Sequence, residues 1–284
     1  MEIVRTIQKL RAWSRENRSQ HGAAIGLVPT MGALHAGHAS LIRAARGACS
    51  QVAVSLFVNP TQFSPNEDFA RYPRAFDADC ALAEAEGADV LFAPSVEEMY
   101  PAGAANSATY VDVAELSERL DGASRPGHFR GVATVVAKLL IAAEPDFAFF
   151  GQKDAAQVAV LRRMVADLRF ATEIVVCPIV RDADGLALSS RNAYLSAAER
   201  DQALALGHAI RHVELLVAQG ERRANALIAA ARSIFATEPG MRVDYVELVD
   251  WAALQRVAVA MPGSLFAVAA YVGKTRLIDN AILG

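Results

Sequence analysis

Two histidines at helical spacing could bind a phosphate. His35 and His38 lie in the stretch 25–43, whose sequence is IGLVPTMGALHAGHASLIR. Three residues apart at the start of a helix, they would lie on one face and could reach the same bound group. An imidazole donates a hydrogen bond whether it is neutral or charged, so this pair suits a phosphate.

The residues around these histidines predict a strand, a loop and a helix. An apolar run at 23–28 predicts the strand, and helical spacing follows in Leu34, His38, Leu41 and Ile42. Gly32 and Gly37 lack a Cβ and let a ligand approach the backbone closely. The amides at the start of a helix have no acceptor within it and therefore attract an anion. We expect a phosphate-binding loop here.

Other interpretations of the histidines remain open at this point. Two surface histidines could share the spacing by coincidence. A zinc site is disfavoured because no Cys, Asp or Glu lies near His35 and His38 to complete a tetrahedral set. A second pair, His208 and His212, shares a face of a later helix without a third ligand, and we interpret it as surface residues.

Composition and charge exclude several classes of function. The chain has 284 residues, 53% hydrophobic and 21% charged, which is typical of a globular protein with a buried core. A formal charge of −3 offers no broad surface for nucleic acid. No run approaches the roughly 20 apolar residues of a membrane span. The three cysteines are widely spaced, which is typical of reduced thiols in a cytosol: Cys49, Cys80 and Cys177. We expect a cytoplasmic protein that acts on a small molecule, without nucleic-acid or membrane partners.

Strands and helices alternate through the first two thirds of the chain. Short apolar runs predict strands at 51–58, 89–92, 146–150 and 173–177. Helical patterns lie at 3–17, 76–86, 132–143 and 155–168. This alternation predicts an α/β fold, a Rossmann-like doubly wound parallel sheet, over residues 1–178. We also expect a short strand at 109–113 and irregular loops at 63–74 and 121–131.

Residues 179–284 predict a second, smaller α+β domain that covers the site. Ser196 and Glu199 form a capping box for a long helix. A second helix is expected at 223–235, and strands are expected at 243–249, 264–271 and 275–282. The polar stretch 188–191 lies at the hinge between the two domains.

Polar side chains follow two of the predicted parallel strands. Open α/β sheets bind ligands at the carboxyl ends of their strands. Asn59 and Gln62 follow one such strand, although a simple Asn-Pro turn would also explain Asn59. The segment 151–154 follows another, and Gln157 lies on the first turn of the next helix. The loop at 121–131 presents basic side chains that could face a ligand or only the solvent: Arg125, His128 and Arg130.

Two nucleotide-binding motifs are absent in their complete form. Residues 273–275 resemble the end of a P-loop, but Val268 stands where glycine is required and the triplet joins two predicted strands. No G-x-G-x-x-G follows a predicted strand, so an NAD-dependent dehydrogenase is disfavoured.

Six blocks of the sequence together resemble the pantothenate synthetase family, the pantoate–β-alanine ligases of the nucleotidyltransferase superfamily. They are, in order, PTMGALHAGH, FVNPTQF, RYPR, RPGHFRGV, FFGQKD and GLALSSRN. Six ordered blocks are more specific than any one of them. The resemblance implies ATP-dependent condensation of (R)-pantoate with β-alanine to pantothenate through a pantoyl adenylate, with release of AMP and pyrophosphate. It also implies Mg²⁺ on the leaving group.

The resemblance also implies roles for single residues. His38 matches the proton donor, and His35, Lys153 and Arg191 are the other expected catalytic residues. The expected ATP-binding residues are Met31, Gly32, Ala33, Leu34, His35, Ala36, Gly37, His38, Gly151, Gln152, Lys153, Asp154, Val180, Leu188, Ser189, Ser190 and Arg191. The expected substrate-binding residues are Gln62, Gln157, Asn59, Arg125 and His128. The loop at 63–74 matches a mobile segment that covers the site.

Several positions depart from the pattern of the family. Gln152 and Asp121 both stand where glutamate is usual, and Ala155 and Ala156 replace an aromatic residue and a glutamine. An acidic metal-binding pair of some relatives maps to Ala78 and Asp79, so no protein metal ligand is expected. The family resemblance further implies a homodimer through the N-terminal domain.

Two other functions remain possible on these residues. The chain could be another adenylyl- or cytidylyltransferase, whose reaction would stop at a nucleotidylated product. It could also be a degenerate sensor that binds a nucleotide without turnover. A tRNA synthetase is disfavoured because no anticodon-reading domain or basic surface is evident.

Overall fold

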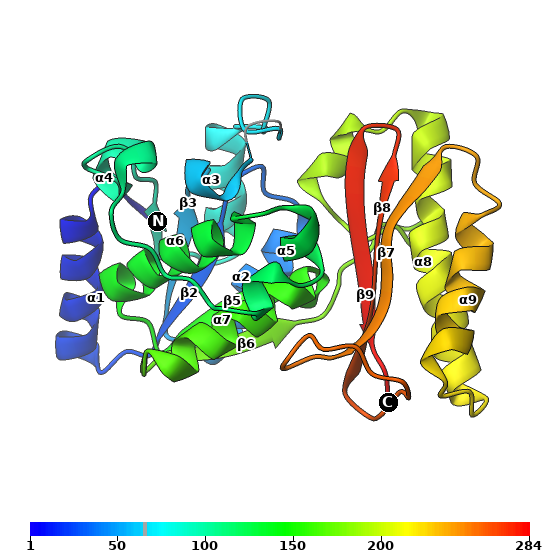
Figure 1. The fold of residues 1–284 in the computed structure, drawn as a ribbon. Coiled ribbons are helices and arrows are strands. Elements are labelled where there is room, and N and C mark those ends of the chain that lie inside the picture. Colours follow the sequence, from blue (N-terminus) through cyan, green and yellow to red (C-terminus); the bar gives the residue numbers. More distant parts are fainter. Residues whose placement is uncertain (65–66) are drawn as a thin grey trace.

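Six parallel strands form the sheet of the N-terminal part in the order β1-β4-β3-β2-β5-β6 (Figure 1). The computed structural model describes residues 1–64 and 67–284. The strands are β1 (Glu2–Val4), β2 (Ile25–Thr30), β3 (Gln51–Leu56), β4 (Val90–Phe92), β5 (Phe147–Gly151) and β6 (Glu173–Cys177). Every registered pair is parallel, which confirms the predicted doubly wound sheet.

The order of the strands reverses between β2 and β5. These two strands pair only at Gly26 with Phe147 and at Leu27 with Ala148, so they share no further register toward their carboxyl ends. At such a point the segments that follow the two neighbouring strands run in opposite directions and leave a crevice between them. Proteins with α/β sheets bind ligands in this crevice. Both the histidine segment, after β2, and the Lys153 segment, after β5, begin at this crevice.

Helices cover both faces of this sheet. The helices are α1 (Ile7–His21), α2 (Ala36–Ala48), α3 (Phe76–Ala85), α4 (Val96–Met99), α5 (Asp121–Ser124), α6 (His128–Ala143) and α7 (Ala155–Asp167). Short 3₁₀ turns lie at η1 (Pro60–Gln62), η2 (Ala104–Asn106), η3 (Leu116–Glu118) and η4 (Gln152–Asp154). Leu27 points into the core with α1, α6 and α7, whereas its neighbour Val28 points into the core with α2 and α3. This alternation is the period of a strand buried on both faces.

A three-stranded antiparallel sheet forms the smaller C-terminal part, in the order β7-β8-β9 (Figure 1). Its elements are η5 (Ser190–Tyr194), α8 (Ala197–Ala218), α9 (Ala224–Phe235), β7 (Met241–Asp250), β8 (Ser264–Val272) and β9 (Thr275–Ile282). Helices α8 and α9 pack on one face of this sheet. The other face contributes Leu265 and Ala267 to the core of the N-terminal part. Ser196 and Glu199 form the predicted capping box of α8.

Three predictions of local structure are wrong. Ile3 lies in β1, because Thr6 caps α1 and the helix begins only at Ile7. Residues 109–113 form no strand, and the amide of Val111 instead donates to Thr134 Oγ1 at 3.0 Å. The segment 121–131 is not irregular throughout, because it holds α5 and the start of α6. Pro126 and Gly127 separate the two helices, whereas Gly122 and Gly131 lie within them.

Candidate active site

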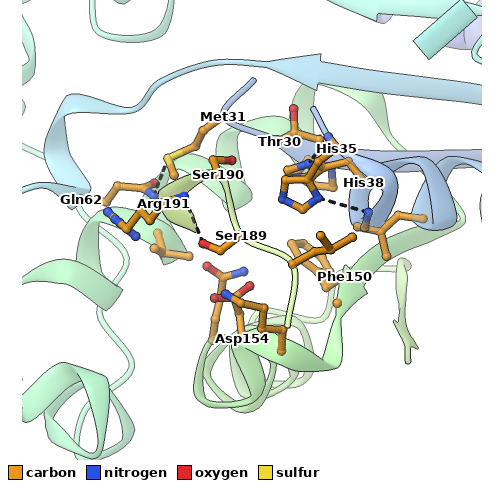
Figure 2. Close-up of a pocket in the computed structure, with 18 of the residues that line it drawn as sticks. Thr30, Met31, His35, His38, Gln62, Phe150, Asp154, Ser189, Ser190 and Arg191 are labelled. Carbon is orange, nitrogen blue, oxygen red and sulfur yellow. Dashed lines mark hydrogen bonds between the residues drawn. The ribbon is translucent and has the colours of Figure 1, made fainter. Parts of the chain in front are cut away.

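A cavity of about 230 Å³ lies at the crevice between the carboxyl ends of β2 and β5 (Figure 2). It brings together most of the predicted site residues, from segments that are far apart in the sequence. These are Met31, His35, Gly37, His38, Gln62, Arg125, His128, Gly151, Lys153, Asp154, Gln157, Val180, Leu188, Ser189, Ser190 and Arg191. Gly32, Ala33, Leu34, Ala36, Asn59 and Gln152 are not among its lining residues.

The backbone amides that the sequence suggests for phosphate are already occupied. Asp79 is buried on α3, and its carboxylate accepts from the amides of Ala33 at 2.9 Å and of Leu34 at 2.7 Å. Gly32 donates to Thr30 Oγ1 at 3.2 Å. Gly32 and Ala33 both have positive φ, a backbone shape that makes an anion-binding concavity. The protein's own carboxylate therefore holds the loop amides of Ala33 and Leu34, and phosphate binding at the helix start stays a prediction.

The two histidines present protonated Nε2 atoms to the cavity. His35 Nδ1 accepts from the amide of Gly37 at 3.1 Å, and His38 Nδ1 accepts from the amide of His35 at 3.3 Å. Since Nδ1 accepts in both rings, the proton of each neutral imidazole resides on Nε2. The ring centroids are 4.1 Å apart, so both donors can reach one ligand (Figure 2).

Both histidines are neutral at physiological pH. Burial lowers the pKa of His35 to about 4, and the charge of Lys153 adds to this effect. Burial likewise lowers the pKa of His38 to about 3, with contributions from His35 and then Lys153. The histidines therefore offer hydrogen bonds without positive charge, and the cations among the described lining residues are Arg125, Lys153 and Arg191.

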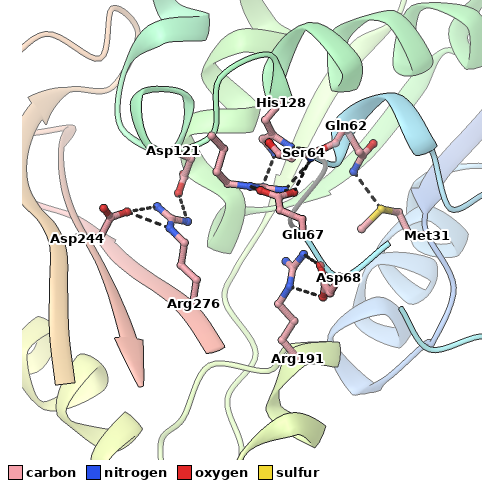
Figure 3. Close-up of polar contacts among 11 residues, drawn as sticks. Met31, Gln62, Ser64, Glu67, Asp68, Asp121, His128, Arg191, Asp244 and Arg276 are labelled. Carbon is pink, nitrogen blue, oxygen red and sulfur yellow. Dashed lines mark hydrogen bonds and ion pairs between the residues drawn. The ribbon is translucent and has the colours of Figure 1, made fainter. Parts of the chain in front are cut away.

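Arg191 reaches the cavity from the hinge between the two sheets. Its guanidinium forms a bidentate pair with Asp68, with distances of 3.0 Å from Nε to Oδ2 and 2.9 Å from Nη2 to Oδ1 (Figure 3). Its amide donates to Ser189 Oγ at 3.3 Å, and Ser190 Oγ donates to the carbonyl of Ala33 at 3.3 Å. The hinge is thus attached to the histidine loop.

Gln62 enters the cavity from η1 and is held in place by Asn59. Asn59 Nδ2 donates to Gln62 Oε1 at 3.1 Å, while Asn59 Oδ1 accepts from the hydroxyl of Tyr100 at 2.8 Å. Gln62 Nε2 contacts Met31 Sδ at 3.0 Å, a weak acceptor (Figure 3). Asn59 is 1% exposed and is fully used inside the protein. In this structure Asn59 positions Gln62, and its role as a direct substrate ligand stays a prediction.

The basic loop faces the cavity, although its side chains are paired. Arg125 forms a bidentate ion pair with Glu67, with 2.6 Å from Nε to Oε1 (Figure 3). Its Nη1 donates to His128 Nε2 at 2.9 Å, so His128 Nδ1 carries the proton and donates to the carbonyl of Gln62 at 2.8 Å. Burial and then the charge of Arg125 lower the pKa of His128 to about 4. This histidine is a neutral link between the loop and Gln62.

One apolar wall of the cavity comes from a helix predicted only as core. Val132, Val135, Val136 and Leu139 of α6 line it, together with Phe150 near the end of β5. The helical spacing of these residues predicts a buried face but cannot distinguish a protein core from a ligand pocket. Phe150 lies near the end of a strand at the crevice, so the rule that ligands bind at carboxyl ends would have found it.

A sequence model described as "Pantoate-beta-alanine ligase" matches residues 2–282. The chain belongs to the pantoate–β-alanine ligase family. Members of this family are ligases, and the chain is an enzyme of that class. The match spans both sheets, so it includes the histidine segment, the Lys153 turn and the hinge.

Relatives with this name are similar along the whole chain. The pantothenate synthetase of Acidobacterium capsulatum is 59% identical, over 100% of this chain and 97% of that protein. The pantothenate synthetase of Koribacter versatilis is 55% identical, over 100% and 96%. Among solved structures, the pantothenate synthetase of Thermus thermophilus has a TM-score of 0.92 and 43% identity, with 99% of each chain covered.

A ligase of this family from Francisella tularensis has been solved in complex with "Beta-gamma ATP" and β-alanine. It is 35% identical to this chain with a TM-score of 0.79, and the match covers 99% of this chain and 97% of that one. Among the described residues of the present chain, no helix has the length and apolarity to cross a membrane.

Two departures from the family pattern have structural counterparts. Asp121 lies with its Oδ1 2.7 Å from Arg276 Nη1 on β9, so it joins the two sheets (Figure 3). Gln152 points away from the cavity and donates to Asn280 Oδ1 at 3.2 Å. Its role as an ATP ligand stays a prediction. The predicted loop at 63–74 includes residues 65 and 66, which lie outside the described residues.

Proposed function

We propose that this chain condenses (R)-pantoate with β-alanine to pantothenate through a pantoyl adenylate, and releases AMP and pyrophosphate. The observation that carries the proposal is one cavity lined by two kinds of group. The phosphate-binding candidates His35, His38, Lys153 and Arg191 line it together with apolar side chains of α6 and with the amides of Gln62 and Gln157. A nucleotide and a small branched hydroxy acid match these two kinds of group by chemistry.

Pantoate fits the apolar side chains of the lining. Its two methyl groups would pack on Val132, Val136 and Phe150, and its hydroxyl and carboxylate oxygens would accept from the amides of Gln62 and Gln157. A carboxylate is already ionised at neutral pH, so its attack on the α-phosphorus of ATP needs no base. The attack does need the two substrates to be aligned. A preformed site supplies this alignment by holding both substrates in the reactive geometry.

The phosphates of ATP fit the polar side chains of the lining. The Nε2 protons of His35 and His38 would donate to phosphate oxygens, and Lys153 would place a positive charge beside them. His38 would act as a neutral hydrogen-bond donor through its Nε2 proton, because burial lowers its pKa to about 3 and little imidazolium forms at neutral pH. These donors stabilise the negative charge that develops on pyrophosphate as it leaves.

Arg191 must exchange partners before it can bind a phosphate. Its guanidinium is paired with Asp68 on the loop at 63–74. Phosphate offers the same bidentate acceptor geometry as the carboxylate, so ATP can replace Asp68. Phe63 and Tyr72 of the same loop line the cavity. We propose that this loop excludes water while the reactive adenylate waits for β-alanine.

The residues of the cavity fit a Mg²⁺ ion that arrives with ATP. Among the described residues no cluster of three or more His, Cys, Asp or Glu could hold a metal ion by itself. Mg²⁺ usually keeps several waters and binds through one or two carboxylates together with substrate phosphates. Asp154 is the one carboxylate among the described lining residues, and it fits that role. The ion would supply charge neutralisation to the leaving pyrophosphate.

The second half of the reaction forms the amide bond. The amino group of β-alanine loses a proton and attacks the carbonyl carbon of the adenylate. The C–N bond forms as the bond between that carbon and the phosphate oxygen breaks, and AMP leaves. Adenylate formation lets an otherwise stable carboxylate react, since AMP is a far better leaving group than oxide.

Two further features of the enzyme follow from the family resemblance. We propose a homodimer through the N-terminal domain, which light scattering coupled to size-exclusion chromatography would measure. We also propose a cytoplasmic location, which is supported by three cysteines that remain free thiols in the structure.

Positional isotope exchange tests the proposed intermediate. ATP labelled at its bridging and non-bridging oxygens is incubated with the enzyme and pantoate, without β-alanine. Scrambling that depends on pantoate would support a reversible adenylate. If no scrambling occurs, β-alanine is added and AMP is assayed, because pyrophosphate held in the site would also prevent scrambling. Formation of ADP in place of AMP would refute the proposal, and ATP binding without turnover would indicate a sensor.

A further inference from the structure

A strand of the C-terminal sheet reaches back to the turn that carries Lys153. Asn280 lies on β9 and is 4% exposed. Its Nδ2 donates to the carbonyl of Gln152 at 3.0 Å and to the carbonyl of Lys153 at 2.9 Å. Its Oδ1 accepts from Gln152 Nε2 at 3.2 Å. Three hydrogen bonds of one side chain therefore end on a single three-residue turn, η4.

The turn has little else to define its shape. The 3₁₀ turn η4 spans only Gln152–Asp154, and no side chain caps its start. Such short turns have poor internal hydrogen-bond geometry and depend on their surroundings. Two adjacent carbonyls fixed by one amide set the direction of the peptide planes on either side of the Lys153 Cα atom. The direction in which Lys153 leaves the backbone follows from them.

The preceding residue of β9 holds the other segment of the cavity. Asp279 is 2% exposed and pairs with Arg181 at 2.6 and 2.9 Å. Asp279 also accepts a hydrogen bond from the backbone amide of Asn280 at 2.8 Å, which fixes the backbone where Asn280 begins. Arg181 follows Val180, a lining residue, and donates to the carbonyl of Gly185 at 3.2 Å. Neighbouring residues of β9 thus bind both the strand-end turn and the interdomain segment.

We propose that Asn280 is a positioning residue that holds the backbone of Lys153 in the geometry required for adenylate formation. The inference rests on the proposed function, because that function places Lys153 beside the phosphates. A displacement of about 1 Å at a reacting group can cost roughly 10²-fold in rate. Asn280 itself is absent from the residues that line the cavity, so it acts through Lys153.

Two substitutions separate hydrogen bonding from space filling. Asn280→Ala removes all three hydrogen bonds, whereas Asn280→Asp keeps the shape but cannot donate to the two carbonyls. We expect each to lower the single-turnover rate of adenylate formation by roughly 10-fold or more, with the dissociation constant of ATP changed by less than about threefold. Rates are measured by rapid quench at a temperature where circular dichroism shows the variants folded.

Trp251 provides a matched control. Its Nε1 donates from the C-terminal part to the carbonyl of Ala155 at 3.0 Å, next to η4 but outside it. Trp251→Phe removes one hydrogen bond between the two parts without touching the turn. We expect its rate of adenylate formation to stay within about twofold of the wild type. A loss in Trp251→Phe equal to that in Asn280→Ala would overturn the inference, because general loosening of the interface would then explain both.

A double-mutant cycle tests whether Asn280 acts through Lys153. In a Lys153→Ala background, Asn280→Ala should cause almost no further loss, since the side chain that it positions is gone. Losses that multiply would overturn the proposal. Should Asn280→Ala not fold, Asn280→Asp is used in the same cycle. A wild-type enzyme that forms no AMP would refute the proposed function. If the wild type is active and both Asn280 variants form the adenylate at the wild-type rate, only this inference is refuted.

Discussion

His35 and His38 show how backbone contacts decide the chemistry of a side chain. Each ring gives its Nδ1 to a backbone amide and keeps its proton on Nε2, which faces the cavity. Burial keeps both rings neutral. The same two residues on a solvated helix face would titrate near neutral pH. At the scale of the residue, the site therefore works with fixed neutral donors.

Replacing His38 tests this role. Its loss to alanine should lower the rate of adenylate formation by at least roughly 10²-fold, the scale of one well-placed donor. His38→Gln should lose less, because the glutamine Nε2 can occupy the place of the imidazole Nε2. His208→Ala is the control, since this histidine is exposed on α8. Near-normal single-turnover kinetics in His38→Ala would refute the role.

The free energy of unfolding should decrease as the pH falls below about 6.5. In the unfolded chain His38 and His128 take up protons near their ordinary pKa of 6.5, while burial holds the folded values at about 3 and about 4. The folded state thus binds fewer protons. The stabilisation that the neutral histidines contribute is complete above about pH 6.5 and is lost as the pH falls toward 4.

Urea denaturation between about pH 7.5 and about pH 5 measures this dependence. His128→Gln should weaken it, because the substitution removes one of the buried titrating groups. His212→Gln, which changes an exposed histidine, should leave the dependence unchanged. Equal slopes in His128→Gln and the wild type would contradict the assignment.

At the scale of the element, helix α3 shapes the loop between β2 and α2. Asp79 holds the amides of Ala33 and Leu34 although it lies 46 residues after Ala33 in the chain. The loop has positive φ at Gly32 and Ala33, so it has little intrinsic preference for this shape. The carboxylate stabilises the turn from which both histidines begin.

Asp79→Ala should destabilise the protein and weaken ATP binding. Two partly buried amides would lose their charged acceptor, which costs about 2 kcal/mol of unfolding free energy. Asp77→Ala is the matched control, since Asp77 is exposed on the same helix. Urea denaturation and ATP titration check the two effects. A variant as stable as Asp77→Ala would show that the loop keeps its shape by itself.

At the scale of the whole molecule, a buried ionic cluster joins the two sheets. Arg276 on β9 lies between Asp244 of β7 and Asp121 of α5, with 2.8 and 2.7 Å between the closest atoms (Figure 3). Tyr245 donates to Asp121 Oδ2 at 3.4 Å, and burial raises its pKa. The cluster borders a second cavity that shares Lys153 and Arg191 with the first.

Removing the arginine of this cluster should cost far more than removing an exposed one. Arg276→Met leaves the buried carboxylate of Asp121 and the partly buried carboxylate of Asp244 without a cation, a loss of about 3 kcal/mol in unfolding free energy. Arg256→Met breaks the ion pair of Arg256 with Glu247. Because the Arg256 side chain is 80% exposed, this loss should cost less than about 1 kcal/mol of unfolding free energy. Calorimetry measures both. Similar losses in the two variants would mean that the cluster contributes no more than a surface pair.

The alternation of apolar runs was enough to predict the architecture. Strand β6 and strand β9 match their predicted bounds, because short buried strands between turn residues leave a clear pattern. Residues 109–113 show where this fails, since an extended apolar segment can satisfy its amides with a side chain such as Thr134 in place of a neighbouring strand. The local sequence pattern of a segment does not show which residue, far away in the chain, will accept its hydrogen bonds.

The sequence by itself determined the family, the parallel sheet and most of the residues around the cavity. These follow from local periodicity, from short motifs and from the rule that ligands bind at the carboxyl ends of parallel strands. Only the tertiary structure decided that Asp79 occupies the loop amides, that Asn59 supports Gln62 and that Asn280 holds the Lys153 turn. Such contacts join residues far apart in sequence. Their geometry depends on how whole elements pack, and no spacing along the chain encodes it.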